Sequence, residues 1–580
     1  MACRVTTLKL PLNPAGSITS GLSGCGLVGP GCVLRFLLCP PVPCDSLTPS
    51  AMKHPNLLLA TAAFALPLLS PAAEPDLVFA SQRRQPGEAG LEITAAAQTW
   101  KPAETALILC DVWDSHHCHR AVLRVQELSP RLDAVVREAR KQGVLIIHAP
   151  SGCMKAYEGH PARLRAQAAP TAPNLPEGIG NWMKWIDQEE EKAGYPVDAS
   201  DGGEDDDPAE HEAWAKELTA KGLNPKAPWT RQIDTIGING EKDLISDSGV
   251  EIWNAMEQRG IRNVFLAGVH ANMCVLGRPF GLRQLTHHGK NTILLRDLTD
   301  AMYNPAMSPR VSHFRGTELI LGHIERYVCP TALSSDVFGG KRMEFSNDPR
   351  PILAVMIGED EYQTWETLPR FAEEQLGSAF RVRYVVPKSG ENHSDFANTA
   401  ELDAASVLLV SVRRRTPPVA QLDAVRRFVD RGGCVVGIRT ASHAFALRDK
   451  APPAGAADWL EWDAMVLGGN YQGHHANTIA TSAHVISNHP VTAGLPTAPF
   501  RTGGSLYQNT PLPVGSTVLL EGQAEGIAQA EPVAWVRKTP AGGRVFYTSL
   551  GHPADFKGAV FPLLLKQALN WAAGISGPER

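Results

Sequence analysis

The sequence predicts an α/β protein built from two domains, each a doubly wound parallel sheet. At 580 residues the chain is too long for one ordinary hydrophobic core, so two domains are expected. In both halves short apolar runs alternate with amphipathic helical patterns, and this alternation is typical of parallel sheets with right-handed crossovers. We expect one domain at residues 95–340, a linker at 341–351 and a second domain at 352–574.

The composition narrows the class of protein. Hydrophobic residues make up 43% of the chain and charged residues 20%, as in globular proteins, and the net charge is −5. No basic run suited to phosphates occurs, so we expect no nucleic-acid partner. Beyond residue 52 the cysteines are too scattered for a zinc knuckle or a disulfide-rich fold, although an isolated disulfide stays open. They are Cys110, Cys118, Cys153, Cys274, Cys329 and Cys434.

The N-terminal stretch has the order of a secretory signal. Met52 opens a short basic start, an apolar run follows at Leu57–Leu69, and small residues precede Glu74. The apolar run is too short to span a bilayer comfortably. We therefore expect a signal peptide at 52–73, an exported (periplasmic or secreted) protein and no membrane span in the mature chain. Residues 1–51 are expected to be a disordered leader or a mis-assigned start.

In the first half, polar residues follow apolar runs. Asp111 follows the expected strand 105–110, and His148 follows the strand 144–147 after an expected helix at 130–141. The stretch NVFLAGVHANMCV (263–275) reads as a strand, a tight turn and the start of a helix expected at 273–285. Ligands bind beyond the carboxyl ends of parallel strands, so we expect Asp111, His148 and Cys274 at one site.

Cys274 has two interpretations. A helix N-terminus favours an anion and would stabilise a thiolate, which makes Cys274 a candidate nucleophile. Alternatively it is a small buried residue beside a strand, as free cysteines mostly are. Under the first interpretation Cys274 should be alkylated rapidly near neutral pH, and Asp111→Asn should slow that reaction.

The pattern breaks between about 155 and 230. Four tryptophans and an acidic tract at 198–212 occur there, without the ligand spacing of a calcium loop. We expect a solvated insertion, and insertions of this length often act as lids over a site. Order returns with a helix at 252–259, a strand at 291–295 and a helix that begins near residue 312.

The LILCD segment (107–111) and the GVHANMCV segment (268–275) resemble the isochorismatase-like cysteine hydrolases, and the resemblance spans most of 100–335. It implies an Asp, Lys, Cys triad, with Asp111 as the base and Cys274 as the nucleophile. It also implies an oxyanion site at the turn before the nucleophile and a cis peptide bond around His270-Ala271. The residues of that turn are His270, Ala271 and Met273.

The lysine is the point of departure from the family. Arg231 occupies the region where the family has its Lys, and Lys226 and Lys242 are rivals. An arginine can supply a fixed positive charge, but it cannot shuttle a proton because the guanidinium stays protonated.

A group of polar side chains near the expected site allows a metal interpretation. Nicotinamidases of the resembled family hold a metal through Asp and His, and imidazole and carboxylate suit a zinc-like divalent ion. The favoured alternative is that these residues line a substrate pocket or hydrogen-bond to Asp111, so that no cofactor is required. The residues are Asp114, His116, His117, His119 and His148.

The second half reads as a fresh α/β run from residue 352. The segments GGCVVGIRTASHAF (432–445), GGNYQGHHAN (468–477) and GGRVFYTSLGHPADF (542–556) resemble the ThuA-like (trehalose utilisation) domains. These share the class I glutamine amidotransferase-like fold, in which a Cys stands at a strand-to-helix elbow. Here Arg439 stands at that elbow and Cys434 lies inside the strand, so amidotransferase chemistry is not expected.

A second ligand site is a candidate in this half. Its residues are either ligands for a small polar molecule, a carbohydrate or a metal, or structural residues of glycine-rich turns. They are Arg439, His443, His474, His475 and His552.

Together these features predict an exported cysteine hydrolase that acts on a small amide, ester or related C–N or C–O bond. Its ThuA-like domain would have an accessory or sugar-related role. The alternative is a non-catalytic exported binding protein for a sugar-like or metabolite ligand, built from two degenerate enzyme domains. A small-molecule ligand is expected in both cases, and both are compatible with a homo-oligomer.

Overall fold

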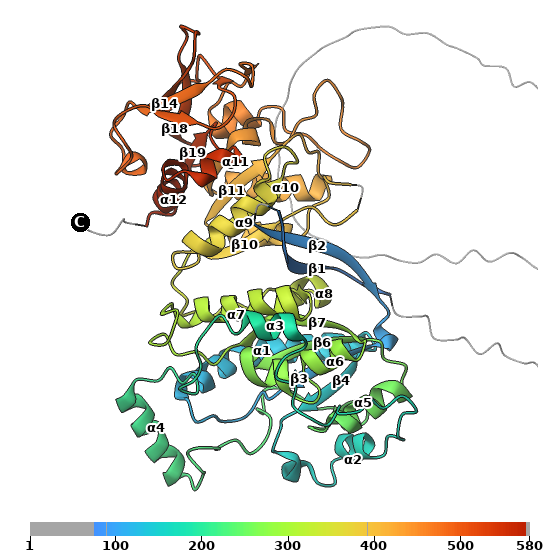
Figure 1. Cartoon of the computed structure of the whole chain (residues 1–580). Coiled ribbons are helices and arrows are strands. Elements are labelled where there is room, and N and C mark those ends of the chain that lie inside the picture. The colour runs from blue at the N-terminus through green and yellow to red at the C-terminus, as the bar shows by residue number, and fades with distance from the viewer. Residues whose placement is uncertain (1–74, 89, 391, 576–580) are drawn as a thin grey trace, which may run out of the picture. The chain divides into compact units, whose positions relative to one another are not determined.

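The computed structural model describes residues 75–88, 90–390 and 392–575, which belong to one compact unit. The expected leader (1–51) and signal peptide (52–73) lie outside the described residues. Two α/β sheets dominate the described chain (Figure 1). Within this part of the chain, no helix is both long and apolar enough to cross a bilayer.

The first sheet has the strand order β2-β1-β8-β7-β6-β3-β4-β5. Strands β3 to β8 pair in parallel, whereas β1 pairs antiparallel with β8 and β2. The α/β class is thus confirmed, but the β1–β2 hairpin, which begins before residue 95, makes the sheet mixed. The bounds are β1 Leu77–Pro86, β2 Leu91–Trp100, β3 Thr105–Cys110, β4 Leu145–Ala149, β5 Leu244–Ile245, β6 Asn263–Val269, β7 Asn291–Asp300 and β8 Thr331–Ala332.

Helices and apolar side chains cover both faces of this sheet. Along β3, Ala106 and Ile108 pack into one core cluster while Leu107 and Leu109 pack into another, because successive side chains of a strand point to opposite faces. The helices are α1 His119–Lys141, α2 Pro161–Gln167, α3 Gln188–Ala193, α4 Pro208–Ala220, α5 Gly249–Gln258, α6 Leu282–His287, α7 His313–Tyr327 and α8 Ser334–Phe338.

Helix α1 begins at His119, well before the expected start at residue 130. Pro130 therefore lies inside the helix, where it cannot donate to the Gln126 carbonyl. The hydroxyl of Ser129 donates to that carbonyl instead, at 3.3 Å, so the break in the backbone ladder is compensated locally.

The helix expected at 273–285 is divided in two. A π-helical turn spans Ala271–Val275, and α6 begins only at Leu282. Pro279 interrupts the ladder between them. A side chain at Gly281 would meet the Val275 carbonyl at 2.8 Å, so the chain reverses tightly there.

The insertion at 155–230 is anchored to the domain, which corrects the expectation of a merely solvated tract. Arg283 of α6 pairs with the buried Glu190 of α3, with Nη2 and Oε1 2.6 Å apart. Arg124 of α1 pairs with Asp205 at 2.8 Å, and both side chains are about 5% exposed.

The second sheet has the order β10-β9-β11-β12-β19-β18-β17-β14-β15. Its first five strands are parallel and the rest are antiparallel, so this sheet is also mixed. The strands are β9 Ile352–Gly358, β10 Arg381–Val385, β11 Val407–Val412, β12 Cys434–Ile438, β14 Thr481–Val485, β15 Phe500–Thr502, β17 Thr517–Ala524, β18 Glu531–Lys538 and β19 Arg544–Thr548.

Apolar side chains fill both faces of this sheet too, with Leu353 and Val355 of β9 on one side and Ala354 and Met356 on the other. The helices are α9 Thr364–Gln375, α10 Val419–Asp430, α11 Pro553–Lys557 and α12 Val560–Ala573, and a small separate sheet pairs β13 Gly473–His474 with β16 Tyr507–Gln508. The expected linker, 341–351, contains no helix or strand.

Candidate functional site

Asp111 lies at the carboxyl end of β3 and is fully buried. Its backbone has φ 50°, a left-handed conformation that turns the chain sharply out of the strand. The carboxylate accepts a hydrogen bond from the Ser151 backbone N–H at 2.7 Å. Ser151 follows β4, so the ends of two parallel strands fix the position of Asp111.

Cys274 lies in the π-helical turn that follows β6, the strand next to β3. Its thiol lies close enough to the Asp111 carboxylate for each group to shift the pKa of the other, so these two residues expected at the strand ends share one site. The two residues meet because β3 and β6 pair in register as far as Cys110 and Gly268.

Arg278 supplies the positive charge at this site. Its Nε donates to Asp111 Oδ2 at 3.1 Å, and its positive charge lowers the pKa of the Cys274 thiol. The Arg278 N–H donates to the Cys274 carbonyl at 3.0 Å, so the two side chains are one helical turn apart. The sequence signal for Arg278 is therefore its spacing of four residues from Cys274, whereas the resemblance to the family points to a basic residue upstream of β6.

Arg231 does not reach Asp111, which corrects the expected site. Its side chain is 53% exposed and pairs with Asp234 at 2.6 Å. The segment is extended and bridges Trp113 through Gln232, so neighbouring side chains point in opposite directions. Gln232 takes the inward position and Arg231 the outward one. The rivals Lys226 and Lys242 are also exposed.

The electrostatics of the thiol also differ from the expectation. Burial raises the pKa of Cys274 above its ordinary value, and the charge of Asp111 raises it further, whereas Arg278 opposes both. Burial likewise raises the pKa of Asp111, against the opposing effect of Arg278. At neutral pH these shifts favour a neutral thiol beside Asp111, in place of the thiolate expected at a helix N-terminus.

The turn before Cys274 contains a cis peptide bond between Val269 and His270, one residue earlier than expected. The Met273 N–H donates to the His270 carbonyl at 3.0 Å, so it is already engaged in the resting turn. The His270 ring is 3% exposed, and burial lowers its pKa to about 3. Ala271 is fully buried beneath the turn.

Aromatic side chains stand beside the thiol. Trp113 and Trp229 stack with ring centroids 4.6 Å apart, and both belong to a small apolar cluster that Cys274 contacts. Trp182 of the insertion lies against Arg278, with its ring 5.3 Å from the guanidinium carbon. The next residue, Met183, donates its N–H to the Gly277 carbonyl at 2.9 Å. The insertion therefore covers the turn after Cys274.

Most of the proposed metal ligands lie apart from one another in the structure, and each has its own polar partner. Asp114 accepts from the Thr230 N–H at 2.9 Å, and His119 pairs with Glu210 at 3.3 Å. The buried His148 is held between Gln232 at 2.9 Å and Asp243 at 3.1 Å.

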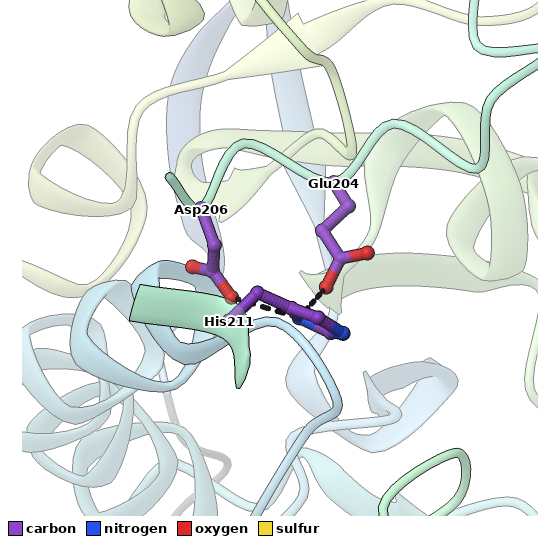
Figure 2. A group of neighbouring side chains, drawn as sticks. All are labelled: Glu204, Asp206 and His211. Atoms are coloured by element: carbon purple, nitrogen blue, oxygen red, sulfur yellow. Dashed lines mark ion pairs between the residues drawn. The ribbon is translucent and has the colours of Figure 1, made fainter. Parts of the chain in front are cut away.

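The two remaining histidines lie beside the turn. The rings of His116 and His117 are 4.0 Å apart, and His116 meets His270 edge-on at 5.0 Å. Burial lowers the pKa of His116 well below its ordinary value, so this ring is neutral and forms part of a polar wall. Among the described residues, the group with metal-ligand spacing contains none of these histidines and consists of Glu204, Asp206 and His211 (Figure 2).

In the second half Arg439 occupies the elbow after β12, with φ 42°. Its guanidinium is 3% exposed and lies between two tyrosine rings, 4.2 Å from Tyr362 and 4.9 Å from Tyr507. Nη1 donates to the Ser549 carbonyl at 2.8 Å. The tyrosines were not foreseen, because they come from segments distant in the sequence.

The histidines near Arg439 divide into two kinds. His443 stacks on Tyr471 at 4.6 Å, and burial lowers its pKa to about 3. The exposed His474 stacks on Tyr507 at 6.3 Å. In contrast, His552 caps α11 by accepting the Ala554 N–H at 3.1 Å, although its ring also lies 6.0 Å from Tyr362.

His475 has a more structural position. Its N–H donates to the Leu506 carbonyl at 2.9 Å, and its Nε2 is buried without a hydrogen-bond partner in the described chain. Arg439, His443 and His474 therefore share an aromatic cluster, His552 lies at its edge, and the five residues do not form one metal-ligand set.

Comparisons with known proteins place the second half in a family. The family model for trehalose utilisation (ThuA) matches residues 364–572, so this segment is a ThuA-like domain. A ThuA-like protein from Bacteroides uniformis is 18% identical, with 40% of this chain and 95% of that chain covered and a TM-score of 0.31. One from Parabacteroides merdae is also 18% identical, with 40% and 93% covered and a TM-score of 0.30.

A solved structure with lower identity is also similar to part of this chain. A cysteine hydrolase from Pseudomonas syringae pv. phaseolicola is 14% identical, with 41% of this chain and 92% of that chain covered and a TM-score of 0.24. The comparison with curated proteins found no match.

Proposed function

We propose that the 95–340 domain is an isochorismatase-like cysteine hydrolase that acts on a small amide, ester or related C–N or C–O bond. The observation that carries this proposal is the grouping of Cys274 with the Asp111–Arg278 ion pair at the ends of neighbouring parallel strands. A nucleophile, a base within hydrogen-bonding reach and a residue that fixes the base are the parts that covalent catalysis requires.

The proposed cycle starts from the neutral thiol. Cys274 gives its proton to Asp111 as sulfur attacks the substrate carbonyl carbon, and the carbonyl oxygen becomes an oxyanion. The C–N or C–O bond then breaks, and the proton on Asp111 goes to the leaving amine or alcohol. Asp111 next deprotonates a water that attacks the thioester, which releases the acid and restores the thiol.

Arg278 has an electrostatic role in this cycle. A buried carboxylate beside a developing thiolate would be two like charges in a poorly solvated place, which is costly. The guanidinium compensates one of them throughout and needs no change in its own protonation. In this role Arg278 takes the place that the resemblance assigns to a lysine. Backbone N–H groups at Ala271, Asn272 and Cys274 are the candidates to hold the oxyanion, because that of Met273 is engaged.

The test is a panel of small chromogenic amides and esters, with mass spectrometry of the quenched protein. The proposal expects turnover and an acyl adduct on Cys274, both absent from Cys274→Ala. Wild-type protein that turns over no member of a broad panel and carries no adduct would contradict it.

The alternative is a non-catalytic binding protein, and the raised pKa of Cys274 favours it because little thiolate exists at neutral pH. This candidate expects no turnover, together with ligand-induced thermal stabilisation that persists in Cys274→Ala. Cys274→Ala therefore distinguishes the two functions: a hydrolase loses turnover in this variant, whereas a binding protein keeps its ligand-induced stabilisation.

For the ThuA-like domain we propose an accessory, sugar-related role at the cluster of Tyr362, Arg439, Tyr471 and Tyr507. Aromatic faces and a guanidinium suit the apolar faces and hydroxyls of a sugar ring. Disaccharides such as trehalose should raise the melting temperature of the wild type but not that of Tyr471→Ala. Export also remains a proposal that rests on residues 52–73, and N-terminal sequencing of secreted protein tests it.

A further inference from the structure

The acidic segment that leads into α4 carries three inward-facing ligand atoms. Glu204 and Asp206 precede the helix and His211 lies in its first turn (Figure 2). One ligand atom from each residue lies within 4.8 Å of the other two. His211 Nδ1 is 3.5 Å from Asp206 Oδ2 and contacts Glu204 Oε1.

Asp206 is held rigidly at this position. Its side chain is fully buried, and its two carboxylate oxygens accept the backbone N–H groups of His119 at 2.7 Å and Arg120 at 2.8 Å. These are the first N–H groups of α1, so Asp206 caps that helix from a distant part of the chain. Oδ1 also accepts from the Cys118 thiol at 3.4 Å, whereas Oδ2, the oxygen that faces His211, retains a second lone pair for another partner.

The other two ligand atoms, Glu204 Oε1 and His211 Nδ1, contact each other. Both atoms are inaccessible to solvent, although their side chains are partly exposed. His211 Nδ1 also faces Asp206 Oδ2 at 3.5 Å. All three atoms therefore point into the same small space, where one cation would contact them together.

We propose that Glu204, Asp206 and His211 bind a divalent cation of the zinc class, which fastens the insertion to the start of α1. One imidazole nitrogen and two carboxylate oxygens form a mixed set that zinc accepts, whereas Mg²⁺ and Ca²⁺ favour oxygen alone. The three residues are distinct from those at Cys274 and Arg439, so this inference is independent of the proposed hydrolysis. Its consequence is structural, because the bound ion would stabilise the folded state by mass action.

The competing explanation for this cluster is that His211 carries a proton in place of a bound metal ion. A protonated His211 between two carboxylates would form ordinary ion pairs and need no metal. The two explanations differ in what Zn²⁺ does to the full-length protein, freed of any affinity tag and treated with a chelator.

Isothermal titration with Zn²⁺ should give one tight site per chain, accompanied by a rise in melting temperature. Glu204→Gln and His211→Ala should each weaken that site at least tenfold and abolish the rise. These two positions are preferred to Asp206, whose replacement would also uncap α1. Affinity should fall as the pH falls, because the imidazole must be neutral to bind.

Matched controls are available nearby. Glu212→Gln removes an exposed carboxylate next to His211, and His287→Ala removes an exposed imidazole elsewhere. Both should bind Zn²⁺ like the wild type, whereas Mg²⁺ should produce no stabilisation. If the wild type lacks a stoichiometric site, or if His211→Ala binds Zn²⁺ as tightly as His287→Ala does, the proposal is wrong and the protonated ion-pair explanation stands.

Discussion

Arg278 binds Asp111 from one helical turn beyond Cys274, with Nε and Oδ2 3.1 Å apart. Asp111 is fully buried whereas Arg278 is 28% exposed, and this ion pair together with the Ser151 N–H stabilises the charge of the carboxylate. The relationship joins the end of β3 to the turn after β6 and accounts for the absence of a lysine from the site.

Arg278→Ala should impair activity far more than Arg231→Ala. Without Arg278 the ionised Asp111 is a buried charge with no compensating partner, and breaking such a pair typically costs about 3–5 kcal/mol. We expect kcat/KM to fall by about two orders of magnitude or more, with partial recovery in Arg278→Lys. Arg231→Ala is the control and should stay within about twofold of the wild type. If kcat/KM falls equally in Arg278→Ala and Arg231→Ala, the assignment of the catalytic positive charge to Arg278 rather than Arg231 is wrong.

The acid limb of the pH profile of kcat/KM should lie above the ordinary pKa of an aspartate, about 4. Burial raises the pKa of Asp111, so the base becomes protonated at a higher pH than an exposed carboxylate would. Arg278→Lys should leave the limb near its wild-type position, and Arg278→Ala should move it further upward. An acid limb at or below pH 4 in the wild type would contradict the assignment of Asp111 as base.

The rate of alkylation of Cys274 shows whether Asp111 acts as a base or as a group that stabilises the thiolate. Because burial and then Asp111 raise the pKa of Cys274, iodoacetamide should react slowly with it at pH 7 and faster as the pH rises. Asp111→Asn removes the neighbouring negative charge, so it should preserve or accelerate alkylation while it abolishes turnover. This reverses the order expected from a thiolate at a helix N-terminus, and mass spectrometry of the modified peptide measures it.

Asp243 should stabilise the fold in a pH-dependent way. Burial alone would raise its pKa, but hydrogen bonds from His148 and Arg140 outweigh burial and lower the pKa to about 2. A depressed pKa contributes stability that is present above the unfolded value, about 4, and is lost as the pH falls towards 2. Asp243→Asn should cost about 2–3 kcal/mol at pH 7, and the difference from the wild type should shrink below pH 4. Chemical denaturation at several pH values measures it.

Gly277 should be intolerant of a side chain because of the insertion. A Cβ at this position would lie 2.4 Å from the Trp182 ring, so Gly277→Ala must displace that ring from Arg278. If the insertion covers the bound substrate, both Gly277→Ala and Trp182→Ala should raise KM more than they lower kcat. Lys192→Ala, which removes an exposed side chain of the same insertion, is the comparison. A change in kcat alone would indicate that Trp182 acts only through Arg278.

The sequence by itself determined the two α/β halves and the pairing of Asp111 with Cys274. Strand and helix periodicities are local, and a polar residue directly after a buried run marks a strand end wherever the strand is placed. The sequence also located the ThuA-like domain and its elbow at Arg439. These features follow from residues close together in the chain.

Only the tertiary structure decided which arginine lies at the site and whether the Cys274 thiol is protonated at rest. Arg231 and Arg278 carry the same charge, so the sequence alone does not distinguish them. In the fold, the Arg231 side chain points outward from an extended segment, whereas that of Arg278 points from the turn after Cys274 towards Asp111. The pKa of Cys274 depends on burial by segments far apart in the chain, which no local pattern encodes. The same holds for Glu204, Asp206 and His211, since the capping of α1 by Asp206 fixes where the other two ligand atoms meet.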